Sequence, residues 1–528
     1  MTRVVRRSLI AVAVLVAIGV AVFIRLATGL TPYLRDHVVE ALNARFSSKV
    51  DLKTLQVSAF PRPEVYGEGL EVRYNGRTDV PPLISIPSFS ASAGIFGLRS
   101  NPLRLNTVEL DGLDIHIPVG GLNPGRKPAA PGEGPRIAPP APTPGHDHEN
   151  PSALTIERLL ARSATLEIAS KDPLKLPRRF EIHDLEMLEL GGNDGAKFRA
   201  ALTNPKPHGR IDAEGTFGPW HKDEPRLTPI RGDYLFGSAN LDTIKGIGGT
   251  LSSAGTYKGT LERIDVTGHT ETPDFVIDIA GHPMPLTTTF AAVVDATNGD
   301  TWLERVEAKI GNTTILAQGA VVRAREVKGR HIALDVQIEN GRLEDLMALA
   351  VKAAKPPVTG RVAIKTKLVI PAGEQDVAEK LQLAGEFALA EAQFTNLNVQ
   401  QRINVLSKRA KGDEAADNSA SVVSNLRGRF VMRDAAIHFS SLTFAIPGAV
   451  VQLAGSYDLR SELVDFNGDL LLDASLAEMT TGVKSIAARI VQPFFRRPGG
   501  GSKLPIRISG PRAKPSFGLN VKRAFLPG

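Results

Sequence analysis

The chain has 528 residues, of which 42% are hydrophobic and 23% charged, and its net charge is +7. This length exceeds one ordinary hydrophobic core, so it predicts several units or one elongated unit. Basic and acidic residues are mixed along the chain, and no basic stripe with interleaved aromatic residues is present, which argues against a nucleic-acid partner. The absence of cysteine excludes disulfides, thiolate zinc sites and cysteine nucleophiles.

The N-terminus has the pattern of a membrane anchor. Three arginines in the first seven residues precede an uncharged apolar stretch at 9–24. A helix over residues 8–30 is long enough to span a bilayer, with Arg25 at the interface. The alternative, a cleaved signal peptide, would have a shorter apolar region and a small-residue cleavage site. We expect an uncleaved anchor over residues 1–30, with a cytoplasmic N-terminus and the rest of the chain outside the cytoplasm.

Residues 31–118 are predicted to form a small N-terminal unit of one helix and several strands. Thr31 is suited to cap the helix, and Pro32 to begin it. Residues 119–151 are rich in proline and glycine and almost free of large apolar residues, which predicts an extended, disordered linker. Strands are predicted at residues 50–55, 70–74, 105–110 and 113–117.

A long antiparallel sheet is predicted over residues 152–528. Apolar and polar residues alternate there in run after run, as in residues 332–338, which is typical of strands with one apolar and one solvated face. Asn298-Gly299 and Asn340-Gly341 are predicted turns. Helices are predicted at residues 343–350 and, from its capping pattern, beginning at Ser475.

A glycine two residues before an aromatic residue recurs in this region, and five such pairs predict a common shape for the sheet. Residues two apart share a face of a strand, so each glycine falls on the apolar face. There it would let the sheet curl toward that face, giving a curved apolar trough. The alternative is a glycine notch that accommodates a neighbouring aromatic side chain in an ordinary β-sandwich core. The pairs are Gly215 and Phe217, Gly255 and Tyr257, Gly385 and Phe387, Gly428 and Phe430, and Gly455 and Tyr457.

The predicted fold class is mainly β with few helices: an N-terminal transmembrane helix, then an elongated, curved antiparallel sheet that forms a hydrophobic groove. Few helices and few aromatic residues are available to cover so many one-faced strands, and an uncovered apolar face marks a binding site. We expect a phospholipid or another acyl lipid to occupy it. The candidate groove residues are Leu383, Phe387, Leu389, Phe430, Met432, Val451, Leu453, Tyr457 and Leu459.

A second candidate site is a short cluster near the C-terminus. Phe494 and Phe495 stand beside Arg496 and Arg497, which suits contact with an anionic membrane surface or a protein partner. The alternative is a helix C-terminus, where cations are favoured by the helix dipole and the phenylalanines pack inward.

Motifs that carry catalytic chemistry are not evident. His146 and His148 stand beside acidic residues, but they lie in the predicted linker rather than in a fixed metal geometry. Residues 246–249 read Gly-Ile-Gly-Gly without the Lys-Ser/Thr of a phosphate-binding loop. His331, like His116 and His183, stands at a polar strand position and is expected to be solvated. We therefore expect no catalytic residue, no cofactor and no metal, and a protein that is not an enzyme.

Several phrases resemble the bacterial AsmA-like family. In the C-terminal third they are "DVQIENGRLEDLMAL", "LAGEFALAEAQFTNLNVQQRINVLSKRAKG", "FAIPGAVVQLAGSYDL" and "LPIRISGPRAKPSFGLN", and near the N-terminus "VDLKTLQVSAFPRPEVYGEGLEVRY". The resemblance covers about residues 1–118 and 335–528. It implies a single-pass inner-membrane protein of Gram-negative bacteria that faces the periplasm. It also implies a β-groove related to bridge-like lipid-transfer proteins, and a role in outer-membrane lipid homeostasis and biogenesis.

Three functions remain open at this point. The first is a non-enzymatic protein that binds or transfers lipids in its groove. The second is a scaffold or assembly factor for outer-membrane proteins, with a closed core and a partner in the outer membrane or periplasm. The third, with the least support, is a hydrolase.

Overall fold

The computed structural model describes most of the predicted sheet. The predicted anchor (8–30), the helix at Thr31, the linker (119–151), the helix from Ser475 and the Phe494–Arg497 cluster lie outside the described residues. Within the described part of the chain, no helix combines the length and apolarity needed to cross a membrane. The described residues are 49–58, 64–73, 80–94, 100, 103–117, 154–168, 177–192, 194–221, 224–244, 246–277, 282–324, 327, 329–350, 355–356, 358–373, 375, 377–395, 397–411, 423–474, 500–511 and 514–519.

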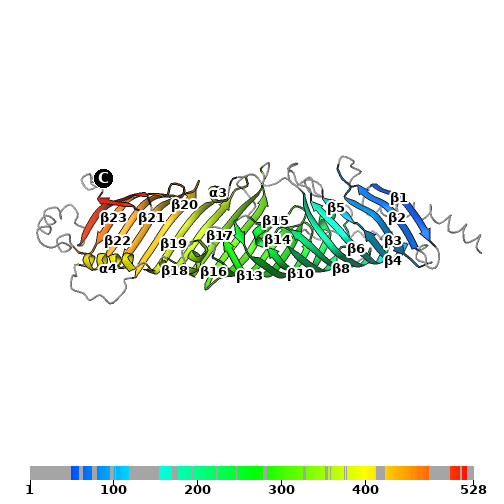
Figure 1. Ribbon diagram of the computed structural model, residues 1–528, viewed down its shortest axis with the longest axis horizontal. Helices are drawn as coiled ribbons and strands as arrows, with labels where there is room; N and C mark the ends of the chain where they lie inside the picture. Colours follow the sequence, from blue (N-terminus) through cyan, green and yellow to red (C-terminus); the bar gives the residue numbers. More distant parts are fainter. Residues whose placement is uncertain are drawn as a thin grey trace, which may run out of the picture.

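Over the described residues the fold is mainly β: one long, curved, 25-stranded sheet, drawn out into an elongated molecule (Figure 1). Nearly every strand pairs antiparallel with the next strand in the sequence, so the order in the sheet follows the chain. The N-terminal strands are β1 (Lys49–Ser58), β2 (Glu64–Arg73), β3 (Ile84–Ser92), β4 (Leu103–Asp111), β5 (Asp114–Ile117), β6 (Leu154–Ile168), β7 (Arg178–Leu190), β8 (Ala196–Pro205) and β9 (His208–Phe217).

Two places depart from this simple meander. Strands β4 and β5 both pair antiparallel with β3 and parallel with β6, so together they fill one position in the sheet. The two-residue β11 pairs with β13. The middle strands are β10 (Pro229–Asn240), β11 (Ile247–Gly248), β12 (Thr250–Thr260), β13 (Arg263–Ile277), β14 (Met284–Asp295), β15 (Asp300–Ile310), β16 (Thr313–Arg323) and β17 (Arg330–Arg342).

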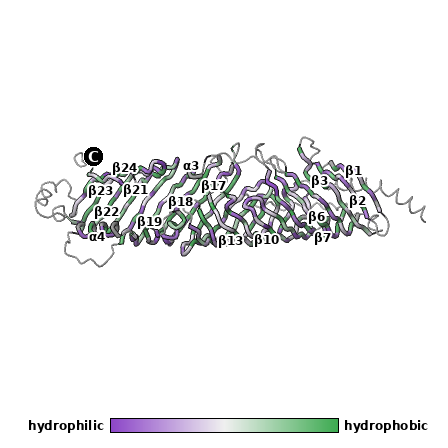
Figure 2. The backbone as a smooth tube through the Cα atoms, viewed as in Figure 1, coloured by the Kyte–Doolittle hydropathy of each residue, from purple (hydrophilic) through white to green (hydrophobic). Residues whose placement is uncertain are grey.

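Alternating hydropathy along the strands continues to the C-terminal end of the sheet (Figure 2). This pattern explains why these segments are strands, because each can place its apolar residues on one face. The C-terminal strands are β18 (Val358–Ile370), β19 (Gln382–Phe394), β20 (Ser424–Arg433), β21 (Ala436–Ile446), β22 (Ala449–Asp458), β23 (Leu463–Leu472), β24 (Ser502–Pro511) and β25 (Ser516–Leu519).

Short helices occur in the connections between strands. The α-helices are α2 (Leu343–Ala350), α3 (Val377–Lys380) and α4 (Leu397–Lys411), and the 3-10 turns are η3 (Pro225–Leu227) and η4 (Leu241–Thr243). Helix α2 confirms the helix predicted at 343–350, whereas α4 was not predicted. Ala410 of α4 is fully buried in a cluster with Ile446, Ala449 and Leu472, so α4 packs on the ends of β21, β22 and β23.

The two predicted turns have different outcomes. Asn298-Gly299 does form the turn between β14 and β15, where the buried Asp295 carboxylate accepts hydrogen bonds from Thr297 and Asn298. The turn predicted at Asn340-Gly341 is wrong. Gly341 pairs with Val362 in the ladder, after a bulge that follows Ile338, and β17 continues directly into α2.

The sheet coils strongly in its middle. Arg178 begins β7 and Arg330 begins β17, and the two strands run in opposite directions, so the two residues lie at opposite long edges. They are nevertheless close enough for the charge of Arg178 to contribute to lowering the pKa of Arg330, which burial lowers most. The strands of this region correspondingly cross one another in projection (Figure 1).

Candidate functional site: the apolar face of the sheet

A continuous row of directly opposed residues crosses the whole sheet, and we call it the central row. Directly opposed residues on neighbouring strands share a face. Every member is glycine, aliphatic or aromatic except Thr366. The central row is Leu55, Gly67, Phe89, Leu110, Ala161, Leu185, Ala200, Ala213, Tyr234, Gly255, Gly268, Phe290, Val306, Ala317, Val336, Thr366, Gly385, Phe430, Phe439, Gly455, Phe466, Ile508 and Phe517.

A second row of the same character lies beside the central row on the same face. We call it the first flanking row, and it contains no charged residue from β2 to β24. Its members are Val65, Ala91, Val108, Leu159, Met187, Phe198, Gly215, Gly232, Tyr257, Val266, Ala292, Leu303, Gly319, Leu334, Leu368, Leu383, Met432, Ile437, Tyr457, Val464 and Gly510.

The second flanking row lies on the other side of the central row, in two stretches. The three rows together define the apolar face. The first stretch is Ala164, Ile182, Leu202, Ile211, Phe236, Ser253, Thr270, Thr288, Ala308 and Ile315. The second is Ile338, Ile364, Phe387, Gly428, Leu442, Leu453, Gly468, Ile506 and Leu519.

Burial of the apolar face changes along the molecule. In the N-terminal strands it is covered: Val65, Ala91, Val108 and Ala161 belong to one buried cluster. From Leu185 to Ile508 the central row is half-buried throughout, apart from the buried Phe466. Over most of the sheet, therefore, the apolar face keeps part of its surface accessible.

The recurring glycine-x-aromatic phrase is explained by the strand register. Gly232 of β10 stands opposite Tyr257 of β12, and Gly255 of β12 stands opposite Tyr234 of β10. A Cβ atom built on Gly255 would lie 2.8 Å from the Tyr234 ring, so the ring occupies the space above the glycine. The notch alternative is therefore right about ring packing, but the strands described belong to one sheet rather than to a sandwich.

The same reciprocal arrangement recurs on β19 and β20. Gly385 is opposite Phe430, and Gly428 is opposite Phe387. A Cβ atom on Gly428 would come within 2.9 Å of the Phe387 ring. Two antiparallel strands that carry the same phrase thus place each glycine under the partner's ring.

Four phenylalanines form an aromatic cluster at the C-terminal end of the apolar face. The ring centroids of Phe387 and Phe430 are 6.2 Å apart, those of Phe430 and Phe439 6.5 Å, and those of Phe439 and Phe466 5.8 Å. Phe387 and Phe430 are candidates from the sequence, whereas Phe439 and Phe466 are not. The sequence marks Phe439 and Phe466 only by the period-two alternation of β21 and β23, because no glycine stands two residues before either of them.

The other candidates occupy varied positions. Leu383 is opposite Met432, and Leu453 is opposite Leu442. Tyr457 is opposite Ile437, and Val451 is opposite Phe444. Leu389 and Met432 are buried, at 8% exposure each. The candidates on β19, β20 and β22 thus share the apolar face, although not all of them are accessible.

Leu459 differs from its expected place on the strand. Strand β22 ends at Asp458, and Leu459 follows in the turn with 38% of its surface exposed. The reason is the Asp458 carboxylate, which accepts hydrogen bonds from the backbone of Arg460 and Ser461 at 3.0 and 2.7 Å. These bonds stabilise the turn and lower the pKa of Asp458.

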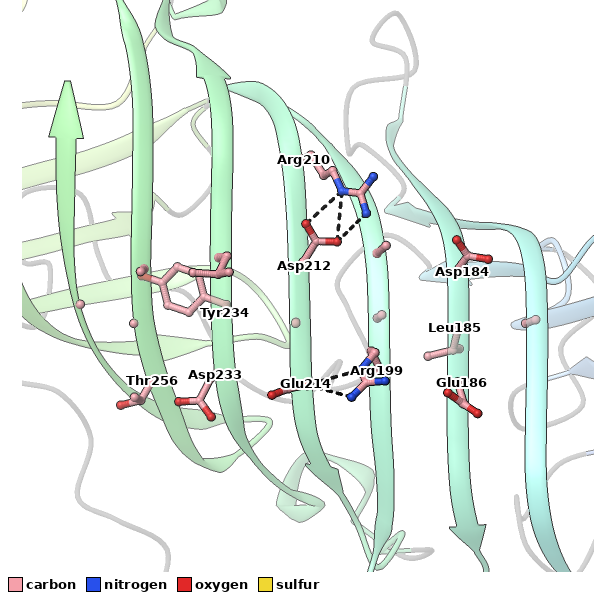
Figure 3. A pocket seen from close by; sticks show the side chains of 18 of the residues that line it. Asp184, Leu185, Glu186, Arg199, Arg210, Asp212, Glu214, Asp233, Tyr234 and Thr256 are labelled. Carbon is pink, nitrogen blue, oxygen red and sulfur yellow. Dashed lines mark hydrogen bonds and ion pairs between the residues drawn. The ribbon is translucent and has the colours of Figure 1, made fainter. Parts of the chain in front are cut away.

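The opposite face of the sheet carries charges in pairs. Central-row residues and their neighbours along β6–β10, β12 and β13 line a hollow of about 1010 Å³ (Figure 3). Within it Arg210 contacts Asp212 at 2.8 Å and Arg199 contacts Glu214 at 3.4 Å. The hydrogen bond from Arg210 lowers the pKa of Asp212. These pairs are exposed, so each contributes little to stability.

Histidine and metal chemistry gains little support from the geometry. In the described ranges no group of three or more His, Cys, Asp or Glu residues is arranged to hold a metal ion. The expectation that His331 is solvated is wrong: it is 9% exposed, and burial lowers its pKa. It is paired in the ladder with Val322, which belongs to a buried cluster with Trp302, and this packing encloses it.

Comparison with known proteins adds no relative. The chain matches no family model, no curated protein and no solved structure.

Proposed function

We propose that the apolar face is an open groove that binds acyl lipids, and that the protein carries them without chemical change. The observation that supports this most is the continuity of the three rows, which hold no charged residue and remain half-buried over most of the sheet. A large accessible apolar surface on one face of a protein marks an interaction site.

The dimensions of the face suit acyl chains. Neighbouring rows are two residues apart along a strand, so three rows span about 13 Å, and the central row crosses 23 strands, a path of about 105 Å. Charged side chains line the opposite face, where they stay in water. A lipid would lie with its chains on the three rows and its polar group toward solvent.

The proposal includes the resemblance to the AsmA-like family. In that setting residues 8–30 anchor the chain in the inner membrane of a Gram-negative bacterium, and the sheet lies in the periplasm. Lipid would move along the groove passively toward the outer membrane and support its lipid homeostasis. Direction would come from another component, because lipid sliding on an apolar surface has no energy source of its own.

The proposal is tested by measuring the lipid that copurifies with the wild type and with a matched pair of variants. Phe387→Asp places a charge on the apolar face, whereas Ala388→Asp places the same charge one residue away on the exposed face. We expect mass spectrometry to find acyl lipid with the wild type and Ala388→Asp, and severalfold less with folded Phe387→Asp. Stable protein without lipid in all three would contradict lipid binding.

An assembly role remains the second candidate, because of the last strand. In β25, Phe517 is 74% exposed and Leu519 54% exposed, far more than other members of their rows. Such residues suit contact with a protein partner at the end of the sheet. Loss of a copurifying outer-membrane protein in Phe517→Ser, with lipid content unchanged, would support this function.

A further inference from the structure

The second flanking row is interrupted by hydroxyl side chains at one place. Ser253, Thr270 and Thr288 are directly opposed on β12, β13 and β14. On one side the row continues with Phe236 and Ile211, and on the other with Ala308 and Ile315. This band is near the middle of the molecule (Figure 1). We call it the hydroxyl band.

Further hydroxyl groups surround the same place. Tyr234 is the central-row residue beside Phe236. Its hydroxyl group lies 3.1 Å from the Ser253 hydroxyl, within hydrogen-bond distance. Ser253 in turn donates to the carbonyl of His269 at 3.0 Å. Thr272 shares the face of Thr270 by alternation and is 1% exposed, and its buried hydroxyl has no hydrogen-bond partner in the described structure. A buried hydroxyl left without a partner costs free energy, so this part of the face is more polar than the rows around it.

Charge is lacking on this side of the four strands involved. The residues of β10, β12, β13 and β14 that share the face are all uncharged: Ile230, Gly232, Tyr234, Phe236, Ala239, Leu251, Ser253, Gly255, Tyr257, Gly259, Ile264, Val266, Gly268, Thr270, Thr272, Phe275, Met284, Leu286, Thr288, Phe290, Ala292 and Val294. The band can therefore donate hydrogen bonds, but it offers no cation to a phosphate. It suits a neutral acceptor attached to apolar chains.

We propose that the hydroxyl band binds the ester carbonyl groups of a glycerolipid whose acyl chains extend along the apolar rows on either side. This inference rests on the proposed function and specifies its ligand. The hydroxyl groups of Thr270 and Thr288 donate to the carbonyl oxygens, because both side chains are half-buried and neither hydroxyl forms a hydrogen bond within the described residues. The hydroxyl band is thus a polar binding position for lipid between apolar stretches of the second flanking row.

The test compares ester and ether lipids on the full-length protein in nanodiscs. The protein is photolabelled with a diazirine-bearing diacylglycerol or with its dialkyl ether analogue, and adducts on peptides of β10–β16 are counted by mass spectrometry. The wild type should label about tenfold more with the ester, since two hydrogen bonds are at stake. Thr270→Val/Thr288→Val keeps the side-chain shape and should remove this preference.

A matched control lies on the same region of the sheet. Thr256 and Thr267 are hydrogen-bonded to each other at 3.0 Å on the opposite face. Thr256→Val/Thr267→Val should keep the ester preference. Adducts without ester preference, or a preference that survives in Thr270→Val/Thr288→Val, would overturn the hydroxyl-band inference while leaving the groove. Absence of adducts with both probes, in a protein that is folded, would overturn the groove and the band together.

Discussion

Some glycines of the sheet are required because a side chain would not fit at their positions, whereas others are not. On β10, a Cβ atom on Gly232 would lie 2.0 Å from the carbonyl oxygen of Glu214 and 2.7 Å from the Tyr257 hydroxyl. A Cβ atom on Gly237 of the same strand would meet nothing within 4 Å. The two glycines therefore form a natural pair of test and control.

Alanine at these two positions should have opposite consequences. Gly232→Ala forces the β9–β10 backbone apart and should lower stability by about 1–3 kcal/mol. Gly237→Ala should be neutral or slightly stabilising, because it restricts the unfolded chain. The midpoint of urea unfolding, followed by circular dichroism, measures both. Equal midpoints for the two variants would show that glycine is not sterically required at position 232.

His331 gives the sheet a dependence on pH. Burial lowers its pKa below the ordinary value of 6.5, which it regains on unfolding. The unfolded chain therefore binds more protons at mildly acidic pH, so the stability contribution is intact above pH 6.5 and falls as the pH drops below it. His331→Gln should reduce the loss of urea midpoint between pH 7.5 and 5.5, measured by tryptophan fluorescence. An unchanged loss would assign the pH dependence to other groups.

Helix α4 packs against one edge of the sheet near the C-terminal end of the sheet. Ala410 is fully buried against Ile446 and Leu472, and the Ser407 hydroxyl donates to the Pro447 carbonyl at 2.5 Å. Ala410→Asp buries an unpaired charge and should cost about 2–5 kcal/mol, which releases α4 from the strands. Hydrogen exchange of residues 397–411 should then become much faster. Val405→Asp, at a 47% exposed position of the same helix, should leave the exchange unchanged.

Strands were easier to predict from the sequence than their connections. The alternation of residues 332–338 predicts a strand directly, and β17 contains it. The Asn340-Gly341 turn failed because a bulge absorbs the turn-forming residues within a continuing strand. Helix α4 was missed although Val399, Ile403 and Ala410 have helical spacing, because it stands alone among strand patterns.

Part of the candidate site was also beyond prediction from the sequence. The faces of Phe387 and Leu453 follow from alternation, which is local. Which residues of neighbouring strands are opposed, and so form the three rows, depends on strand register. Register is shifted by bulges such as those near Phe439 and Leu303. The hydroxyl band illustrates the limit, because Ser253, Thr270 and Thr288 are meaningful only once they are opposed.

For the whole molecule, the central claim is that lipid lies on the apolar face. Leu453 is a half-buried member of that face, and Ala454, the next residue, is exposed on the opposite face. A photoreactive amino acid at each position, activated in living cells, reports what touches each face of β22. We predict that position 453 captures acyl lipid and that position 454 does not. Lipid captured equally at both positions, or protein alone at position 453, would contradict the account.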